Sequence, residues 1–276
     1  MAQMTIDRAS AAGPMAGRAG FAEAVRAEWV KFRTVRGTVI SALATIATGV
    51  HGGLVFGFRT VRDYFEAAPA DRADFDPMLL ATVRPLSMAM IAAGVIGVLA
   101  VTSEYASGTI RVSAIAVPSR RRLYAAKAVV VGAVSLVVGQ IAALETFLIS
   151  QRVLAAANVP SLGFTGPETV RAVVGGGLCL TLTALLGVAV GFLMRVTAGA
   201  VAVTTLVTIL PGMAPIFPDP VADLIGRYWP SSAGLRVAAL RPDPDLLGPA
   251  TGFALMCGYV AVLLVIALIV FRDRDV

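Results

Sequence analysis

The stretch SEYASGTIRVSAIAVPSRRRLYAAK, residues 103–127, joins two apolar segments that are each about long enough to cross a membrane. It contains one carboxylate, Glu104, a Gly-Thr pair at 108–109, a proline at Pro118 and three consecutive arginines at 120–122. A plain connection between two membrane segments does not need this mixture of residues. The composition of the whole chain shows what kind of protein surrounds it.

The chain has 276 residues, of which 57% are hydrophobic and 14% are charged. Soluble domains carry about 25% charged residues, so this composition indicates an integral membrane protein. The net charge of +6 can indicate nucleic-acid binding. Here, however, the basic residues flank apolar runs, as they do in membrane proteins. We therefore expect the lipid bilayer, and no nucleic acid, as a partner.

A transmembrane helix needs about 20 predominantly apolar residues, and the chain contains six such runs. They are continuous, whereas barrel strands alternate polar and apolar residues, so the sequence predicts an all-α integral membrane protein with six transmembrane helices. The fifth run contains Pro211 and should be kinked there. The segment after it, 218–249, contains Tyr228 and Trp229, which favour the membrane interface, and we expect it to re-enter the bilayer in part. The six predicted spans are 37–58, 85–102, 128–149, 172–194, 198–217 and 250–271.

The distribution of Lys and Arg predicts the orientation of these spans. With the N-terminus in the cytoplasm, the inner segments hold 14 of the 23 basic residues and 6 of the 17 acidic residues. Basic residues concentrate on the cytoplasmic side of membrane proteins. Both termini are therefore predicted to be cytoplasmic.

The N-terminal region divides into two parts. Residues 1–20 are small and polar and are expected to form a disordered cytoplasmic tail. Residues 21–36 predict an amphipathic interfacial helix, because four of the apolar residues fall within one arc of about 80°, although Val30 lies opposite it. Lys31 lies off that arc. Such a helix lies in the headgroup plane; the alternative is a cytoplasmic cap packed on the bundle. The residues of the apolar arc are Phe21, Val25, Trp29 and Phe32. Residues 37–276 then form the membrane domain.

The loop quoted first contains signals for a short helix of its own. Gly108 allows unusual backbone angles, and Thr109 is a good N-cap residue. Residues 109–117 could then form two helical turns, which Pro118 ends. This helix would lie across the cytoplasmic end of the bundle, where it would be bound either by a soluble partner or by headgroup phosphates. The residues by themselves do not decide between the two.

The pattern EYASGTIR…VPSRRRLYAAK resembles the cytoplasmic loop of type-2 ABC transporter permeases, and AEWVKFRTVRGT at 27–38 is similar to the segment before their first span. The resemblance implies a coupling helix that docks on a separate ATPase subunit, and it makes residues 21–36 a connecting helix along the inner leaflet. It also implies two permease copies, identical or different, assembled with two ATPase subunits. Carried over to this chain, Glu104, Gly108, Thr109 and Arg111 would lie in or beside the ATPase contact, with Pro118 and Arg120 shaping the exit into the third span.

The chain lacks the motif that would let it hydrolyse ATP itself. A P-loop requires Gly-x4-Gly-Lys-Ser/Thr, and neither of the two lysines, Lys31 and Lys127, fits it. We therefore expect no enzymatic activity, catalytic residue, cofactor or metal in this chain. ATP and Mg²⁺ would be bound by the partner ATPase.

A histidine, a glutamine and a glutamate lie within the predicted spans, where ionisable groups are candidates for a transport path. They are His51, Gln140 and Glu145. The alternatives are an interior packing role for His51 and an ion pair at the outer interface for Glu145. Two GxxxG patterns, at 53–57 and 187–191, permit close helix approach, and the first makes span 37–58 a candidate dimer face.

Together these observations predict the permease subunit of an ATP-driven exporter in the bacterial cytoplasmic membrane. A lipophilic or amphipathic cargo is expected from the resemblance, while the substrate itself is not specified by any residue. The alternatives are an ion-coupled secondary transporter and a membrane scaffold or sensor partner that transports nothing. An ion-coupled transporter would be expected to bury more charged groups at mid-membrane than the single Glu145.

Overall fold

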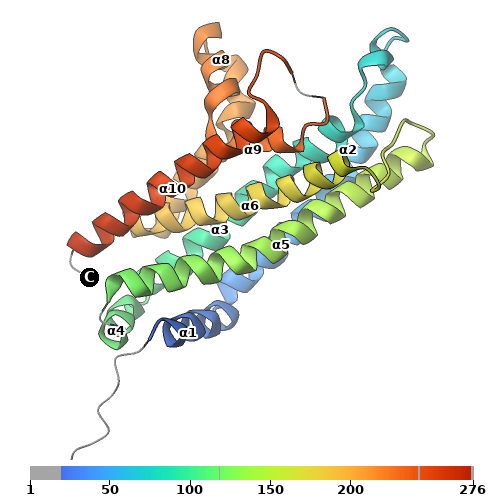
Figure 1. Ribbon diagram of the computed structural model, residues 1–276. Helices are drawn as coiled ribbons and strands as arrows, with labels where there is room; N and C mark the ends of the chain where they lie inside the picture. The colour runs from blue at the N-terminus through green and yellow to red at the C-terminus, as the bar shows by residue number, and fades with distance from the viewer. Residues whose placement is uncertain (1–19, 118, 242, 275–276) are drawn as a thin grey trace, which may run out of the picture.

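The computed structural model describes residues 20–117, 119–241 and 243–274. This part of the chain is 85% helical and contains no strand, and six of its segments are long and apolar enough to cross a membrane. The predicted fold class is confirmed (Figure 1). Apart from Gly20, the expected N-terminal tail lies outside the described residues, as does Pro118. The six segments are α2 (Arg36–Glu66), η2 with α3 (Leu79–Val83, Arg84–Ala106), α5 (Arg120–Ala156), α6 (Pro167–Met194), α7 with η3 (Thr197–Ile209, Leu210–Ile216) and α10 (Pro249–Asp273).

The remaining elements are short and lie at the two ends of the bundle (Figure 1). At one end are α1 and α4, together with the end of α10. At the other end are the connection from α2 to α3, the connection from α5 to α6, and the hairpin of α8 and α9. The bounds are α1 (Phe21–Thr34), η1 (Asp71–Asp74), α4 (Thr109–Ala116), α8 (Asp219–Tyr228), α9 (Pro230–Leu235) and η4 (Arg236–Ala238).

Several helices continue past the predicted spans into the aqueous layer. The first predicted span ends at residue 58, whereas α2 continues to Glu66. Its last turns carry ion pairs between Arg59 and Asp63 (3.8 Å) and between Arg62 and Glu66 (3.0 Å), each four residues apart. Pairs at this spacing stabilise exposed helix. A hydropathy criterion misses these turns because they are polar.

The helices α3 and α6 pack backbone against backbone. A Cβ atom at Gly97 of α3 would overlap the backbone of Ala184, and one at Gly187 of α6 would overlap the backbone of Gly94. The absence of side chains at these positions allows the two helices to touch. The glycines at 187–191 therefore allow close packing of α6 on α3 within this chain.

The glycines at 53–57 do the same on α2. A Cβ at Gly53 would lie 3.0 Å from the carbonyl oxygen of Thr146, and one at Gly57 would lie 3.1 Å from Cβ of Val153. Both contacts are with α5. These glycines are therefore covered inside the chain, and the expectation that span 37–58 forms a dimer face stays a prediction.

The kink expected at Pro211 is present, since α7 ends at Ile209 and continues as the 3₁₀ helix η3. Proline lacks the N–H that would bond the carbonyl four residues earlier, which here belongs to Val207. That carbonyl accepts a hydrogen bond from Trp229 Nε1 (2.7 Å) and another from Ser231 Oγ (3.1 Å). The side chains of the α8–α9 hairpin thus satisfy the backbone group that the kink exposes.

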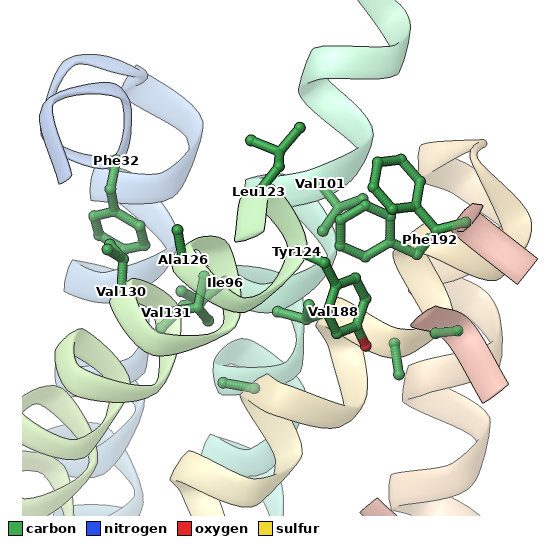
Figure 2. Packing of buried hydrophobic residues seen from close by; sticks show 14 of the residues in the cluster. Phe32, Ile96, Val101, Leu123, Tyr124, Ala126, Val130, Val131, Val188 and Phe192 are labelled. Atoms are coloured by element: carbon green, nitrogen blue, oxygen red, sulfur yellow. The ribbon is translucent and has the colours of Figure 1, made fainter. Parts of the chain in front are cut away.

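The end that carries α1 and α4 has its own hydrophobic core, in which Phe32 of α1 packs beside Val130 of α5 and Tyr124 packs on Phe192 (Figure 2). The first described helix, α1, and the end of the last helix, α10, both lie at this end (Figure 1). An even number of spans requires this arrangement. Which end faces the cytoplasm remains a prediction from the charge distribution.

The helix α1 begins at Phe21 and ends at Thr34, and one stripe of it packs on the bundle. The buried residues of this stripe are Ala24, Glu28 and Phe32. Phe21 and Trp29, predicted to share the apolar face with Phe32, are 46% and 48% exposed, and Val25 is half-buried. The helix therefore packs on the bundle along one stripe, and its exposed aromatic side chains are available to the membrane interface. Its interfacial position stays a prediction.

Candidate functional site

Four charged side chains meet at the α1/α4 end of the bundle, and we call them the ion-pair cluster. Glu28 and Lys31 come from α1, Glu104 from the end of α3 and Lys127 from the first turns of α5. Their formal charges sum to zero. The cluster connects elements that are up to 99 residues apart in the sequence.

Lys127 lies at the centre of the cluster, and its side chain is 3% exposed. Its ammonium group donates to Glu28 Oε2 (2.5 Å), to Glu104 Oε1 (2.8 Å) and to the carbonyl oxygen of Ala100 (3.0 Å). An ammonium group has three donors, so all of them are used. A buried charge is tolerated only when it is paired in this way.

Lys31 completes the cluster from the surface side, with 34% of its side chain exposed. Its ammonium group donates to Glu28 Oε1 (2.5 Å), to Glu104 Oε1 (3.0 Å) and to Ser113 Oγ of α4 (3.0 Å). Burial by itself would lower the pKa of Lys31, but the charges of Glu28 and Glu104 outweigh it and raise this pKa above its ordinary value. Through Ser113 the cluster also holds α4.

The two lysines of the cluster are the only lysines in the chain, because its other 21 basic residues are arginines. A lysine ammonium is a compact charge whose three donors can point in different directions, whereas an arginine guanidinium is a planar fork. Bridging two carboxylates and a third acceptor from one point suits lysine. This rarity was the sequence signal that could have revealed the cluster.

The predicted short helix is present as α4, which begins at Thr109 and ends at Ala116. Its N-cap is Gly108, with φ of +70°, and an added Cβ there would meet nothing within 4 Å. Glycine is favoured here because of its backbone conformation alone. Thr109, expected as the cap, is instead the first helical residue, and its hydroxyl lies 2.9 Å from that of Ser107.

One face of α4 packs on the bundle, and another is exposed. Ile110 is buried and anchors the helix. Val112 is 67% exposed, Ile115 is 79% exposed, and Arg111 is exposed beside them. Contiguous exposed apolar side chains of this kind mark interaction surfaces.

Glu104, predicted to lie in or beside the ATPase contact, is 6% exposed. A partner protein could not reach it directly. Its Oε1 atom accepts from both lysines, and its Oε2 atom is buried with no hydrogen-bond partner among the described residues. Glu104 therefore positions the helices that carry the exposed face.

Arg120 also has a contact that the sequence did not predict. Its guanidinium donates to the carbonyl oxygens of Phe271 (3.0 Å), Arg272 (3.2 Å) and Arg274 (2.5 Å). These carbonyls lie at the end of α10, where a cation is favourable. Arg120 thus ties the start of α5 to the end of the last span.

Neighbouring contacts attach the connection between α6 and α7 to the same end. The guanidinium of Arg195 lies over the ring of Tyr105 at 5.3 Å, and Thr197 Oγ1 donates to Thr102 Oγ1 at 3.0 Å. Both partners are on α3, next to Glu104. The end of α3 is consequently held from several sides.

The three polar residues predicted for a transport path are not brought together. His51 is exposed on α2, so its predicted interior packing role is wrong for this chain. Gln140 is half-buried and donates to the carbonyl oxygen of Val174 (3.1 Å), which links α5 to α6. Glu145 is half-buried, and its Oε2 atom has no hydrogen-bond partner among the described residues. It forms no ion pair with another described residue.

A cavity of about 490 Å³ borders the ion-pair cluster. It is lined by all four cluster residues and by parts of α2, α4 and α5. The α1/α4 end is therefore not close-packed throughout. Within residues 20–117, 119–241 and 243–274, no group of three or more His, Cys, Asp or Glu side chains is placed to hold a metal ion.

Comparison with known proteins gives one match. A family model described as ABC-2 family transporter protein matches residues 24–212, from the first turn of α1 into η3. The match includes the ion-pair cluster and α4. No curated protein matches the chain.

Proposed function

The chain belongs to the ABC-2 family of transporter proteins, and we propose that it is an export permease driven by a separate P-loop ATPase that docks on α4. Family membership and the six apolar helices make the chain a multi-pass membrane permease of an ABC transporter. The observation that carries the finer proposal is the exposed apolar face of α4, held in place by a buried and neutral ion-pair cluster.

The proposed docking surface consists of Arg111, Val112 and Ile115 of α4, with the exposed Trp29 of α1 nearby at the same end. By the charge distribution this end is cytoplasmic, where an apolar patch has no lipid core to cover it. A soluble partner would bury these side chains. The basic Arg111 suits an acidic residue on that partner.

The ion-pair cluster supports a route from the docking surface to the spans. Ser113 of α4 accepts from Lys31, whose neighbours in the cluster are on α3 and α5. A displacement of α4 by the ATPase would therefore act on two transmembrane helices and on α1. In this proposal, tilting of these helices in two permease copies opens and closes the path.

The remaining features of the proposal follow from the same mechanism. ATP and Mg²⁺ are bound by the ATPase, and a second permease copy completes the path. The membrane is the bacterial cytoplasmic membrane, and the cargo is lipophilic or amphipathic.

The docking surface is tested by purification of the full chain in mild detergent, together with its ATPase. We expect a soluble protein with a Walker motif to purify with the permease in equal amounts. Ile115→Glu should reduce the bound ATPase by about tenfold or more, because it places a charge in the centre of the interface. The matched control is Leu224→Glu, on the α8–α9 hairpin at the opposite end, where Leu224 is 59% exposed. Retention of the ATPase by the Ile115 variant would disprove docking on α4.

The positioning role of Glu104 requires a different measurement. Glu104→Gln keeps the shape of the side chain but leaves the cluster with one excess positive charge. We expect the ATPase still to bind, while stimulation of its activity by transported cargo falls. A variant with normal stimulation would show that the cluster only supports the fold.

A further inference from the structure

A second cavity, of about 580 Å³, lies at the end of the bundle opposite to α1 and α4. Three parts of the chain enclose it: the start of α3 with η2, the kink between α7 and η3, and the segment from α8 to just after η4. Its volume falls within the range of about 300–1,000 Å³ that is typical of small-molecule sites. It is separate from the cavity beside the ion-pair cluster.

The lining of this cavity combines apolar surface with positive charge. Leu79, Met88, Ile209 and Leu235 supply apolar side chains, and hydroxyl groups come from residues such as Ser87. The charged residues in the lining are Arg84, at the start of α3, and Arg236, in η4. No carboxylate belongs to the lining.

Neither guanidinium forms an ion pair or a hydrogen bond with another described residue, although Asp243 lies near enough to Arg236 to act on its charge. The hydrogen bond between Ser87 and Arg84 (2.6 Å) uses the carbonyl oxygen of Arg84 and leaves its guanidinium free of that contact. Two other cations at this end are engaged: Arg171 donates to the carbonyl oxygens of Val237 (2.8 Å) and Ala239 (3.1 Å), and Arg62 pairs with Glu66.

Arg236 is half-buried, and burial lowers its pKa. The nearby Asp243 raises this pKa, but by less than burial lowers it. Arginine nevertheless remains charged at neutral pH. A partly desolvated cation near the membrane is unfavourable unless an anion accompanies it. Together with the exposed Arg84 on the same lining, Arg236 therefore favours an anionic occupant.

The walls of the cavity are held in place before anything binds. Trp229 and Ser231 attach the α8–α9 hairpin to the carbonyl of Val207 at the kink. Arg171 attaches the segment around η4 to α6. A site whose walls are already ordered loses less entropy when a ligand binds.

From this lining we propose that the cavity binds an anionic amphiphile, with its carboxylate or phosphate between Arg84 and Arg236 and its alkyl chain on the apolar lining. The apolar side chains distinguish this occupant from a free inorganic anion, and the two arginines distinguish it from a neutral lipid. The interpretation of this occupant as transported cargo rests on the proposed export function. The binding itself does not.

The two tryptophans of the chain lie at opposite ends, which provides a local probe. In a Trp29→Phe variant the remaining fluorophore is Trp229, between Gly226 and Ser231, which both line the cavity. The full chain would be placed in bilayer discs of zwitterionic lipid and titrated with a fatty acid that carries bromine at the end of its chain. Bromine quenches tryptophan only at short range. The pH is kept well above the pKa of the acid, which the low-dielectric bilayer surface raises above the value of about 4 in water, so that the acid is ionised.

We expect saturable quenching by the bromo fatty acid and binding that is weaker by about tenfold or more for the matching bromo alcohol. Arg84→Gln and Arg236→Gln should each weaken binding of the acid by about tenfold, while Arg227→Gln, an exposed arginine of α8 outside the lining, should not. Inorganic phosphate should not compete.

Three results would overturn the proposal: equal quenching by acid and alcohol, which indicates a neutral lipid site; competition by phosphate at low concentration, which indicates a free-anion site; and unchanged binding in both lining variants. The measurement contains no ATPase. Failure of ATPase docking therefore leaves it unaffected, and its own failure leaves the docking proposal standing.

Discussion

Replacing Lys127 with Met should loosen the α1/α4 end of the bundle while the transmembrane core stays folded. The variant keeps the length of the side chain and removes one charge with three hydrogen bonds. Glu28 and Glu104 then share a single cation, Lys31, and the cluster carries one uncompensated negative charge. Because the site is buried, solvent cannot replace the lost partner.

The size of the effect follows from a comparison with Lys31→Met. Both substitutions remove one ammonium group that contacts the same two carboxylates and one further acceptor. The side chain of Lys127 is 3% exposed and that of Lys31 is 34% exposed. Removal of one partner from a buried pair costs about 3–5 kcal/mol, whereas a solvent-accessible pair contributes about 1 kcal/mol or less. The difference between the variants should therefore be at least about 2 kcal/mol.

Hydrogen exchange measured by mass spectrometry on the purified chain is the assay. Local opening of α1 and α4 sets the exchange of their amides, and about 2 kcal/mol corresponds to roughly a 30-fold faster exchange. We expect this acceleration in Lys127→Met relative to Lys31→Met, confined to α1, α4 and the adjoining ends of α3 and α5. Amides in the middle of α6 provide the internal control.

Equal and small effects of the two substitutions would refute the reasoning. That result would mean that Lys127 carries no charge in the folded protein, or that hydrophobic contacts such as those of Phe32 hold α1 by themselves. Exchange that rises throughout α6 would also contradict it, because the cluster would then support the whole bundle.

Three further outcomes are expected. Gly108→Ala should destabilise α4 by about 1–2 kcal/mol, because alanine disfavours the left-handed backbone conformation, and the amides of α4 should exchange hydrogen faster. Gly108→Asn should be less destabilising than Gly108→Ala. Unchanged exchange would contradict the φ of +70°. Gly97→Ala should greatly lower the yield of folded protein, because the added Cβ would overlap the backbone of Ala184. In the control Gly132→Ala, the added Cβ meets only a leucine side chain at 3.6 Å and should be tolerated. Equal yields of the two variants in size-exclusion chromatography would argue against the close packing of α3 and α6. Trp229→Phe should lower the midpoint of thermal unfolding by the equivalent of about 1 kcal/mol. Ser231→Ala should lower this midpoint more in the Trp229→Phe variant than in the unmodified protein, since the carbonyl of Val207 then loses both donors. Strictly additive effects would show that the two donors act independently.

The sequence was sufficient to predict the features that depend on local pattern. Six apolar runs located the spans, Gly108 and Pro118 bracketed α4, and Pro211 located the kink. The extension of α2 to Glu66 was missed because its last turns are stabilised by ion pairs between polar residues, which have no hydropathy signal.

The ion-pair cluster was missed for a different reason. On a helical projection Glu28 lies at the edge of the apolar face, and nothing local shows that it is buried. Its partner Lys127 is 99 residues away, so the pairing depends on how α1 and α5 pack. For the same reason Glu104 was expected beside a partner protein, although it lies 6% exposed inside the chain.

The order in which the cluster residues are synthesised has a consequence for how the protein is made. Glu28 and Lys31 emerge from the ribosome almost together and neutralise each other. Glu104 follows 73 residues after Lys31 and leaves one carboxylate in excess until Lys127 appears 23 residues later. Chains fold from the N-terminus during synthesis, but here the N-terminal helix α1 lacks its partner Lys127 until α5 is synthesised. We expect its docking to become favourable only after Lys127 has been synthesised, because Lys127 pairs with both carboxylates of the cluster.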